Sequence, residues 1–600
     1  MGKSESVKER ISALRAEMEK RGLDIYIVPT SDYHESEYVG DYFKARKYLT
    51  GFTGSAGIAV VTPEEAGLWT DGRYFIQAEA QLAGSGVTLY KSGEEGVPTI
   101  EEFVEKKLKE QGGLGFDGRV MNAAQAEKYA RIAEKKQVKF HVTEDLAGIV
   151  WEDRPDFPAH PVWVLPEEYA GESTADKLAR VREKMEKEKA DAHILTSLYD
   201  IAWLLNIRGG DIDCVPVVLS FLVITKDECR FYVSEKALTE ESREYLRKER
   251  ITVRPYEAVY EEIGALQAEN ILLCKPLTNY RIIKSLSPQA KVIDKENPTE
   301  HMKAVKNPVE IENTRKAHVK DGVAVTKFLY WLKNNIGKQK ITEISASDYL
   351  EQLRREQENF LDLSFTTISA YGPNAAMMHY SATPETDAEL ETKGFLLVDS
   401  GGHYLEGTTD ITRTVALGEL SEEEKQHFTA VCRANLNLAD AKFLYGCRGL
   451  NLDILARGPL WDLGIDYKCG TGHGVGHILN VHEGPNGFRW KLVMERNDSG
   501  ILEEGMITTD EPGVYIEGKY GIRTENELIC RKAEKNEYGQ FMEFENITYV
   551  PIDLDAVLPE EMSRTERRRL NEYHKMVYDT VSPYLTEEER DWLKEYTRKI

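Results

Sequence analysis

The chain has 600 residues, more than one hydrophobic core usually organises, and its length predicts about two to four domains. It carries 77 lysines and arginines against 102 aspartates and glutamates, a formal net charge of −25. A phosphate backbone would be repelled by that charge, so general nucleic-acid binding is disfavoured. The acidity itself leaves two explanations open, a solvating surface or carboxylates that bind metal ions.

The length of the apolar runs and the number and spacing of the cysteines indicate the cellular compartment. No uninterrupted apolar run approaches the ~18 residues of a membrane span, and the first residues lack the apolar core of a signal peptide. The 7 cysteines are few and have no CxxC spacing, which fits reduced thiols better than a disulfide framework. We therefore expect a soluble cytoplasmic protein with no membrane partner.

An internal repeat organises the first half of the chain. Apolar residues at helical spacing over 7–18 predict a helix, and the apolar run 23–28 predicts a buried strand. The same pattern returns 167 residues later, at 178–185 and 193–195. Two ordinary helix–strand units could resemble each other by chance, but the constant offset favours duplication. We expect two successive α/β domains.

Two short segments mark the domain boundaries. Residues 153–166 carry four prolines, which cannot continue a helix. Asn307 followed by Pro308 is typical of a helix start, and an amphipathic helix is predicted from there to about Asn335. The last domain is then the largest, and we expect it to carry the chemistry. The predicted domains are 1–158, 159–305 and 306–600.

Four carboxylates stand out in the last domain. Two predicted hairpins, at 394–415 and 505–530, each carry one acidic residue per strand. An acidic residue within an apolar strand is costly unless a cation or a partner compensates it. The alternative is that these carboxylates are solvated or paired with Arg413 and Arg523. The four residues are Asp399, Asp410, Glu511 and Glu525.

A glycine-rich segment between the hairpins contains His473, His477 and His482. His473 and His477 have the i, i+4 spacing of zinc ligands on a helix, but the interleaved glycines argue against a helix here. We therefore expect His473 to bind metal, and His477 either to be structural or to contact the metal ligands without binding the ion. Four carboxylates and one imidazole would supply the hard oxygen and borderline nitrogen ligands of a two-metal site.

At these residues the chain resembles the pita-bread metallopeptidases. Among them it is most similar to the long, three-domain cytosolic form of the aminopeptidase P (Xaa-Pro aminopeptidase) family, over nearly its whole length. The motifs that carry the resemblance are LLVDSGGHYLEGTTDITRT, GTGHGVGHILNVHEGP, DEPGVY and GIRTENE. The resemblance implies an α/β (α+β) fold, with two creatinase-like N-terminal domains and a pita-bread domain that ends in an extension over about 550–600.

The resemblance also implies the metal ligands. In this family two divalent ions are bound, usually manganese, with zinc or cobalt as alternatives. Asp410 and Glu525 would bridge the two ions. One position departs from the family, because Cys469 stands four residues before His473, where relatives commonly carry another histidine. The implied ligands are Asp399, Asp410, His473, Glu511 and Glu525.

Residues that act on the substrate are implied in the same way. His379, in YGPNAAMMHYSA, and His482, in NVHEGP, match the family's two catalytic histidines. Arg523 and Tyr515 match residues beside the metal carboxylates, Arg523 as a catalytic residue and Tyr515 as a substrate contact. Arg73, in TDGRYF, matches an arginine of the first domain that contacts substrate.

The implied reaction removes the N-terminal residue from peptides with proline in the second position. A water shared by two divalent cations becomes a hydroxide nucleophile, and Glu511 would accept its proton. His482 or His379 would hydrogen-bond the developing oxyanion or the departing proline nitrogen. The preference for proline rests on the resemblance. It has chemical sense because an X–Pro bond lacks an amide N–H and restricts its neighbour.

Other interpretations stay open. The chain could be an X-Pro dipeptidase of the prolidase type, or could catalyse a creatinase-like hydrolysis. It could also be a non-catalytic peptide-binding module with the pita-bread fold, although that requires broken ligands and all five are present. Family habit implies a homodimer, and Trp461 is either a core residue or a subunit contact. The expected partners are X-Pro peptides.

Overall fold

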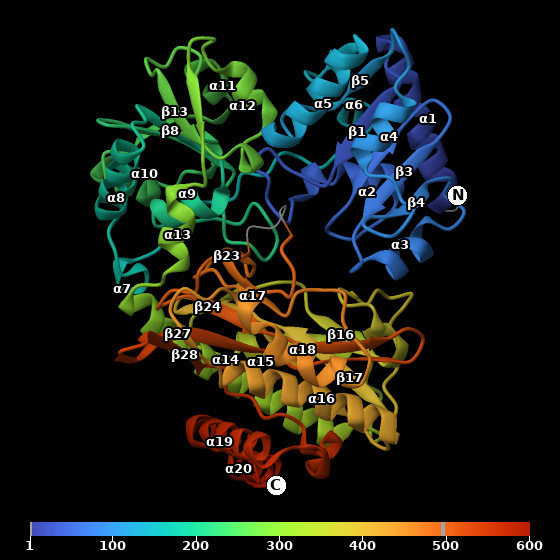
Figure 1. The fold of residues 1–600 in the computed structure, drawn as a ribbon, viewed down its shortest axis with the longest axis vertical. Helices are drawn as coiled ribbons and strands as arrows, with labels where there is room; N and C mark the ends of the chain where they lie inside the picture. The colour runs from blue at the N-terminus through green and yellow to red at the C-terminus, as the bar shows by residue number, and fades with distance from the viewer. Residues whose placement is uncertain (1–2, 494–497) are drawn as a thin grey trace. The chain divides into compact units, whose positions relative to one another are not determined.

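The computed structural model describes residues 3–493 and 498–600 (Figure 1). The chain forms two compact units. The first unit combines Met1–Pro166 with Glu172–Thr299, and the second combines Glu167–Gly171 with Glu300–Ile600. Among the described residues, every helix is too short or too polar to cross a membrane.

The first unit contains two six-stranded sheets of the same topology. The first sheet has the order β4-β3-β2-β1-β5-β6 and the second the order β12-β11-β10-β8-β13-β14. The strands of the first are β1 (Ile25–Pro29), β2 (Ile58–Val61), β3 (Ala66–Thr70), β4 (Thr88–Lys91), β5 (Gly113–Gly115) and β6 (Lys139–His141). Those of the second are β8 (Ala192–Leu195), β10 (Ser220–Thr225), β11 (Cys229–Val233), β12 (Thr252–Pro255), β13 (Asn270–Leu273) and β14 (Lys291–Asp294).

The pairing of the strands also repeats. β1 is antiparallel to β2 and parallel to β5, and β8 is likewise antiparallel to β10 and parallel to β13. Helix α1 (Lys3–Arg21) precedes β1, as α8 (Thr174–Lys187) precedes β8. The predicted apolar stripe over 7–18 is buried in the core of the first sheet. The internal repeat predicted from the sequence is therefore confirmed.

The remaining helices of the first unit cover these sheets (Figure 1). They are α2 (Ala45–Thr50), α3 (Phe75–Leu82), α4 (Ile100–Lys107), α5 (Ala123–Lys136), α6 (Leu146–Ile149), α9 (Leu198–Leu204), α10 (Glu240–Lys248), α11 (Val259–Glu262) and α12 (Tyr280–Ser285). A two-stranded ribbon joins β7 (Trp163–Val164) to β9 (Ile207–Arg208). Helix α13 (Pro298–Ala304) contains the point at which the chain passes into the second unit.

The second unit is built around a long helix and a set of antiparallel sheets. Helix α14 (Pro308–Asn335) begins and ends where the sequence predicts. The Asn307 side chain accepts hydrogen bonds from the backbone N–H groups of Val309 and Glu310, which caps the helix. The other helices are α7 (Glu167–Ala170), α15 (Glu343–Arg355), α16 (Glu422–Ala439), α17 (Gly449–Leu452), α18 (Ile454–Trp461), α19 (Arg564–Val581) and α20 (Glu587–Tyr596).

The strands of the second unit form three larger sheets and one ribbon. The sheets have the orders β15-β18-β19, β16-β17-β20 and β21-β28-β27-β24-β22-β23, and β25 pairs with β26. Their bounds are β15 (Phe360–Leu363), β16 (Ile368–Tyr371), β17 (Phe395–Ser400), β18 (Gly402–Tyr404), β19 (Gly407–Thr408), β20 (Ile411–Ala416), β21 (Lys442–Leu444), β22 (Gly472–Gly474), β23 (Glu483–Phe488), β24 (Ile507–Asp510), β25 (Gly513–Ile516), β26 (Tyr520–Arg523), β27 (Asn526–Asn536) and β28 (Gly539–Asn546).

The two predicted carboxylate-bearing hairpins differ from the observed strands. β17 pairs with β20 and β24 with β27, both antiparallel, but only Asp399 lies inside a strand. Asp410 directly precedes β20, Glu511 directly follows β24 and Glu525 directly precedes β27. The prediction of one acidic residue inside each strand is therefore wrong for three of the four. The backbone leaves the ladder at these points, and the three carboxylates can turn towards one another there.

The C-terminal helices belong to the core of the second unit. Leu570 and Val577 of α19 and Leu593 of α20 are buried in one apolar cluster with Phe428 of α16 and Ile522 of β26. This cluster packs against the ribbon β25–β26. The ribbon connects Glu511 to Glu525, two of the candidate ligands. The extension thus supports the strands that carry the site.

Candidate metal centre

Three of the predicted ligands meet in the second unit. Ligand atoms of Asp410, His473 and Glu525 all lie within 4.8 Å of one another. His473, on β22, has its Nε2 atom 3.4 Å from Asp410 Oδ2 and 3.4 Å from Glu511 Oε1. Segments around residues 410, 473 and 511–525 therefore bring a histidine and three carboxylates close together.

The fifth predicted ligand, Asp399, is joined to this group through Arg523. Arg523 Nη2 donates to Asp399 Oδ2 at 2.6 Å, and Nη1 donates to the hydroxyl of Tyr515 at 2.7 Å. Arg523 Nε also donates to Thr412 Oγ1 at 3.2 Å. One buried guanidinium thus fixes a carboxylate and the neighbouring tyrosine in place.

The carboxylates of this cluster repel one another in the absence of a cation. Burial, followed by repulsion from Asp399 and Glu511, raises the pKa of Asp410 well above its ordinary value. Burial, followed by repulsion from Asp410 and Glu511, does the same to the pKa of Glu525. Bound divalent ions would reverse this effect by favouring the charged carboxylates.

The donor set fits divalent metal ions. Asp399 Oδ1 and Asp410 Oδ1 are buried and have no hydrogen-bond partner within the described part of the chain. Buried polar atoms without a partner are rare and call for an explanation such as a bound ion. Four carboxylates and one imidazole are the ligand types that Mn²⁺ and similar ions accept.

The sequence analysis missed two residues that hold the ligands. Thr412 Oγ1 donates to Glu525 Oε2 at 2.6 Å, and Glu527 Oε1 accepts from the backbone N–H of Asp410 at 2.7 Å. The Glu527 carboxylate also lies 3.1 Å from Nε2 of the buried His318. Each missed residue stands two positions after a ligand, in the strand that this ligand directly precedes. That spacing is a signal that could have found them.

The predicted catalytic residues of the second unit lie around the same point. The ring of His482 meets the ring of His473 edge-on, with centroids 4.2 Å apart and an interplanar angle of 89°. His379 follows Met378, whose carbonyl accepts from Arg523 Nη2 at 3.4 Å. Tyr515 lies against Arg523 as described above. The chain segments of all three therefore border the carboxylate cluster.

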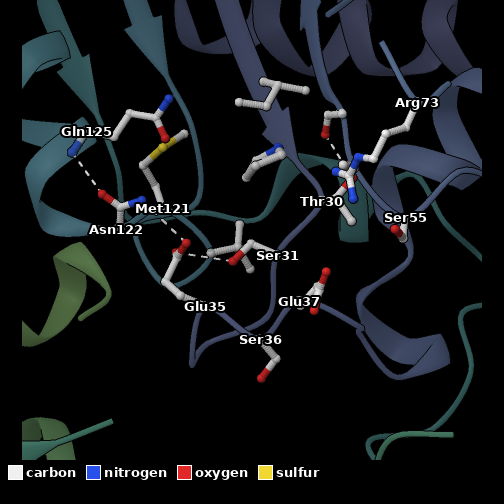
Figure 2. A pocket seen from close by; sticks show the side chains of 15 residues that line it. Thr30, Ser31, Glu35, Ser36, Glu37, Ser55, Arg73, Met121, Asn122 and Gln125 are labelled. Carbon is white, nitrogen blue, oxygen red and sulfur yellow. Dashed lines mark hydrogen bonds between the residues drawn. The ribbon is translucent and has the colours of Figure 1, made fainter. Parts of the chain in front are cut away.

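Arg73, by contrast, belongs to the first unit. Its Nε and Nη2 atoms each donate to a carboxylate oxygen of Asp71 at 2.8 Å. The side chain lines a cavity of about 260 Å³ in that unit (Figure 2).

Two further residues of the glycine-rich segment have structural surroundings. His477 is buried, with Nε2 3.1 Å from the carbonyl oxygen of Tyr169 and Nδ1 3.4 Å from Thr314 Oγ1. These contacts tie it to α7 and α14. Burial raises the pKa of the Cys469 thiol to about 11, so this thiol is neutral at pH 7 and is a poor metal ligand in that form.

A buried group of charges fixes the residue after His482. The Glu483 carboxylate pairs with Lys306 Nζ and lies 3.6 Å from Lys303 Nζ. All three side chains are almost fully buried, with exposed fractions of 6% or less. Asn480 Nδ2 also donates to the carbonyl of His482 at 2.8 Å. The backbone at His482 is therefore held on both sides.

We expect Lys306→Met to destabilise the second unit by about 3 kcal/mol, because it removes a buried partner and leaves the Glu483 charge undercompensated. Thermal unfolding followed by circular dichroism measures the effect. Lys393→Met is the matched control, since Lys393 pairs with Glu391 at 2.6 Å on the exposed surface. Equal melting temperatures for the two variants would contradict the prediction.

Comparison with known proteins places the chain in a family. Residues 10–152 and 153–310 each match the creatinase/prolidase N-terminal domain. Residues 312–532 match metallopeptidase family M24, and residues 540–600 match the C-terminal region of that peptidase. The matches cover both units.

Individual relatives match along the whole chain. Aminopeptidase P1 of Arabidopsis thaliana is 38% identical over 99% of each chain. A probable Xaa-Pro aminopeptidase P of Coprinopsis cinerea is 38% identical over 99% of this chain and 98% of its own. The crystal structure of X-prolyl aminopeptidase from Caenorhabditis elegans, described as a cytosolic enzyme with a di-nuclear active site, superposes with a TM-score of 0.93 at 35% identity. It covers 99% of this chain and 100% of its own.

The likeness to a dipeptidase is more limited. The Xaa-Pro dipeptidase of Bacillus anthracis has a TM-score of 0.51 at 25% identity and covers 64% of this chain. The aminopeptidases, by comparison, match from end to end and include the C-terminal extension. The chain therefore belongs to the Xaa-Pro aminopeptidase (aminopeptidase P) family of M24 metallopeptidases.

Proposed function

We propose that this chain is a metalloaminopeptidase that hydrolyses the N-terminal residue from peptides with proline in the second position. The observation that carries the proposal is the convergence of Asp410, His473 and Glu525 in a chain that matches aminopeptidases P end to end. The unpartnered carboxylate oxygens of Asp399 and Asp410 support a site built for cations.

The ligand set would hold two divalent ions. We propose manganese as the metal, with zinc and cobalt as alternatives, because four of the five donors are hard carboxylates. The bound ions supply Lewis acidity that lowers the pKa of water and polarises the substrate carbonyl. The proposed ligands are Asp399, Asp410, His473, Glu511 and Glu525.

The protein side chains then bind the substrate and move protons. Glu511 accepts the proton of the attacking water, and Thr509 Oγ1, which donates to Glu511 Oε1 at 3.1 Å, orients that carboxylate. His482 and His379 hydrogen-bond the carbonyl oxygen and the departing proline nitrogen. Arg523 acts by holding Asp399 and Tyr515, and Tyr515 and Arg73 contact the substrate.

The choice of substrate separates this function from the dipeptidase alternative. We expect release of arginine from Arg-Pro-Pro by the manganese-loaded chain, measured by chromatography, with a larger kcat/KM than for Gly-Pro. Hydrolysis of Gly-Pro alone would overturn the proposal in favour of an X-Pro dipeptidase.

Metal content separates the enzyme from a non-catalytic peptide-binding module. We expect about two ions per chain after manganese loading and desalting, and no hydrolysis after chelation. Fewer than one bound ion per chain, together with no peptidase activity, would overturn the enzyme assignment.

We also propose that the chain acts in the cytoplasm, because the C. elegans relative is described as a cytosolic enzyme.

We propose three domains, at 1–158, 159–305 and 306–600. The extension at about 550–600 completes the last domain. Limited proteolysis tests the first boundary, which predicts an early cut in the exposed, proline-rich segment near 158.

We further propose that the chain is a homodimer. Trp461 and Trp490 are 41% and 45% exposed, and their rings meet edge-on with centroids 6.1 Å apart. Leu463 and Leu492 are also exposed, and exposed apolar groups of this kind mark interaction sites. Trp461 is therefore not a core residue.

We expect Trp461→Ala to weaken self-association by at least about tenfold, because aromatic anchors dominate interfaces. Sedimentation velocity over a concentration series measures it. Tyr584→Ala is the control, since Tyr584 is 61% exposed and lies outside this apolar group. A monomeric wild-type chain, or equal association of both variants, would contradict the dimer.

A further inference from the structure

A buried guanidinium, that of Arg413 on β20, lies between the candidate metal ligands and the C-terminal extension. The Arg413 side chain is 3% exposed. Its nitrogen atoms donate to six oxygen atoms, and none of these six belongs to a carboxylate. A buried cation without a carboxylate partner is costly unless its donors are satisfied in another way. The partners of Arg413 show what this side chain does.

One end of the guanidinium holds the backbone at a candidate ligand. Arg413 Nη1 donates to the carbonyl oxygens of Glu525 and Thr412, both at 2.7 Å. The backbone N–H of Glu525 donates to the same Thr412 carbonyl at 3.1 Å, and Thr412 Oγ1 donates to the Glu525 carboxylate at 2.6 Å. Arg413 therefore fixes the main chain of Glu525 against β20.

The other end of the guanidinium contacts helix α19 of the extension. Arg413 Nη2 donates to the phenol oxygen of Tyr573 at 2.7 Å and to the carbonyl oxygen of Val550 at 2.8 Å. The Tyr573 hydroxyl in turn donates to the Val550 carbonyl at 2.6 Å. The ring of Tyr573 is buried in the apolar cluster that α19 shares with α16 and α20. The hydroxyl thus accepts from a cation and donates to a carbonyl, and phenylalanine could do neither.

Two buried asparagines extend these contacts towards a second candidate ligand. Arg413 Nη2 donates to Asn526 Oδ1 at 2.8 Å, and Asn526 Nδ2 donates to Asn435 Oδ1 at 3.1 Å. Asn435 Nδ2 donates to the carbonyl of Asp510 at 2.8 Å. Asp510 directly precedes Glu511 in the chain. The hydrogen bonds therefore run from α19 to the backbone at both ends of the ribbon β25–β26.

The shape of the guanidinium couples its two ends. Its donors have a fixed, planar fork geometry, so the contacts at Nη1 and Nη2 are set together. Buried hydrogen-bond networks are also strengthened by the low local dielectric. A change in the Tyr573 hydroxyl is therefore passed on to the backbone of Glu525.

We propose that Tyr573 is a positioning residue for the metal centre, acting through Arg413 on the backbone of Glu525. The C-terminal extension then contributes to metal affinity as well as to the apolar core. This inference rests on the proposed function, because it concerns the ions of the proposed site.

Tyr573→Phe tests the contact with little disturbance, because it removes the hydroxyl and keeps the ring. The probe is Mn²⁺ alone, titrated into the full-length, chelated and desalted chain, with free Mn²⁺ measured by electron paramagnetic resonance. Residues that directly hydrogen-bond a metal ligand contribute about 10–100-fold to metal affinity. Tyr573 acts one residue further away, so we expect Tyr573→Phe to weaken the binding of at least one ion by about threefold to tenfold.

Tyr520→Phe is the matched control. Tyr520 is buried in the same apolar cluster, but its hydroxyl contacts Glu423 and His427 of α16. A general loss of packing or of a buried hydroxyl affects both variants alike. We expect the Mn²⁺ affinity of Tyr520→Phe to equal that of wild type.

A second variant tests the route through Arg413. Arg413→Lys keeps a cation but loses the planar fork that joins Glu525 to Tyr573. Adding Tyr573→Phe to Arg413→Lys should therefore cost no further affinity. If Arg413→Lys does not fold, the spectrum of bound Mn²⁺ in Tyr573→Phe decides. It should differ from the spectra of wild type and Tyr520→Phe, because a displaced Glu525 changes the ligand geometry.

The outcomes separate this inference from the proposed function. Equal Mn²⁺ affinities for wild type, Tyr573→Phe and Tyr520→Phe, or equal losses in both variants, would overturn the inference and leave the proposed function standing. Additive losses from Arg413→Lys and Tyr573→Phe, or unchanged spectra, would overturn the route through Arg413. A loss of affinity confined to Tyr573→Phe, in a chain that hydrolyses no X-Pro peptide, would support the inference and overturn only the proposed function.

Discussion

Asp410→Asn lowers kcat for Arg-Pro-Pro more than about a thousandfold and removes at least one bound ion per chain. Substituting a residue that only hydrogen-bonds a metal ligand already lowers metal affinity or activity by about 10–100-fold. Asp410 is proposed to be a ligand itself, so its substitution should cost more. Its side chain is within 4.8 Å of His473 and Glu525, so a neutral amide there weakens the entire group. Metal analysis and initial rates measure both effects.

The same variant has the opposite effect on the metal-free protein. Asparagine keeps the shape of the side chain but removes one like charge from a buried cluster, so metal-free Asp410→Asn unfolds at a higher temperature than metal-free wild type. Asp579→Asn, at an exposed position of α19, is the control for the substitution itself. Two tightly bound ions and a kcat within tenfold of wild type would contradict the assignment of Asp410.

The raised carboxyl pKa values predict how the metal-free protein responds to pH. Because the folded-state pKa values of Asp410 and Glu525 lie above their unfolded values, the native state holds extra protons. The contribution of these two groups to the free energy of unfolding is therefore largest below the ordinary carboxyl pKa of about 4 and is lost as the pH rises through the raised values. Melting curves of the chelated protein across that range test this. Identical pH profiles for wild type and Asp410→Asn would contradict it.

Local signals in the sequence were sufficient to predict helix α14 and the repeated helix–strand units. The Asn307–Pro308 start of α14 was predicted because a cap and a proline act within one turn. The repeated helix–strand pattern likewise predicted two similar domains. The order of the strands was not predictable, because it depends on pairings such as β1 with β5, separated by more than 80 residues.

The candidate site was only partly predictable for the same reason. Residue type and the family motifs singled out Asp410 and Glu525, but apolar runs do not tell where a ladder ends, so both were placed inside strands. The role of Glu527 depends on a hydrogen bond to a backbone N–H that lies 117 residues away. No local pattern reports that distance, although Glu527 stands only two residues after the ligand Glu525, in the strand that this ligand precedes.

Buried residues that do not bind metal themselves hold the candidate ligands in position. Glu527 holds the backbone of Asp410, His318 pairs with Glu527, and Thr412 holds the carboxylate of Glu525. Each is fully buried, so its interactions are strong and its loss is costly. The positions of the two proposed bridging carboxylates are thus fixed by protein contacts, which lowers the cost of bringing like charges together when ions bind.

His482→Ala lowers kcat for Arg-Pro-Pro by about a hundredfold to a thousandfold while the chain keeps both ions. The His482 ring lies edge-on to His473, and Asn480 and Glu483 fix its backbone, so the imidazole is placed to reach a substrate bound beside the ligands. KM changes little, because a hydrogen bond to developing charge forms chiefly in the transition state.

The metal content of the variants distinguishes a catalytic role of His482 from a role as a metal ligand. His473→Ala should lose an ion together with activity, whereas His482→Ala should lose activity alone, and His301→Ala, at an exposed position on α13, should match wild type. If His482→Ala also lost an ion, the histidine would act by supporting His473. If it kept both ions and a kcat within threefold of wild type, then the proton or hydrogen bond at the reacting amide would have to come from His379. That outcome would place the catalytic role on the loop that follows β16.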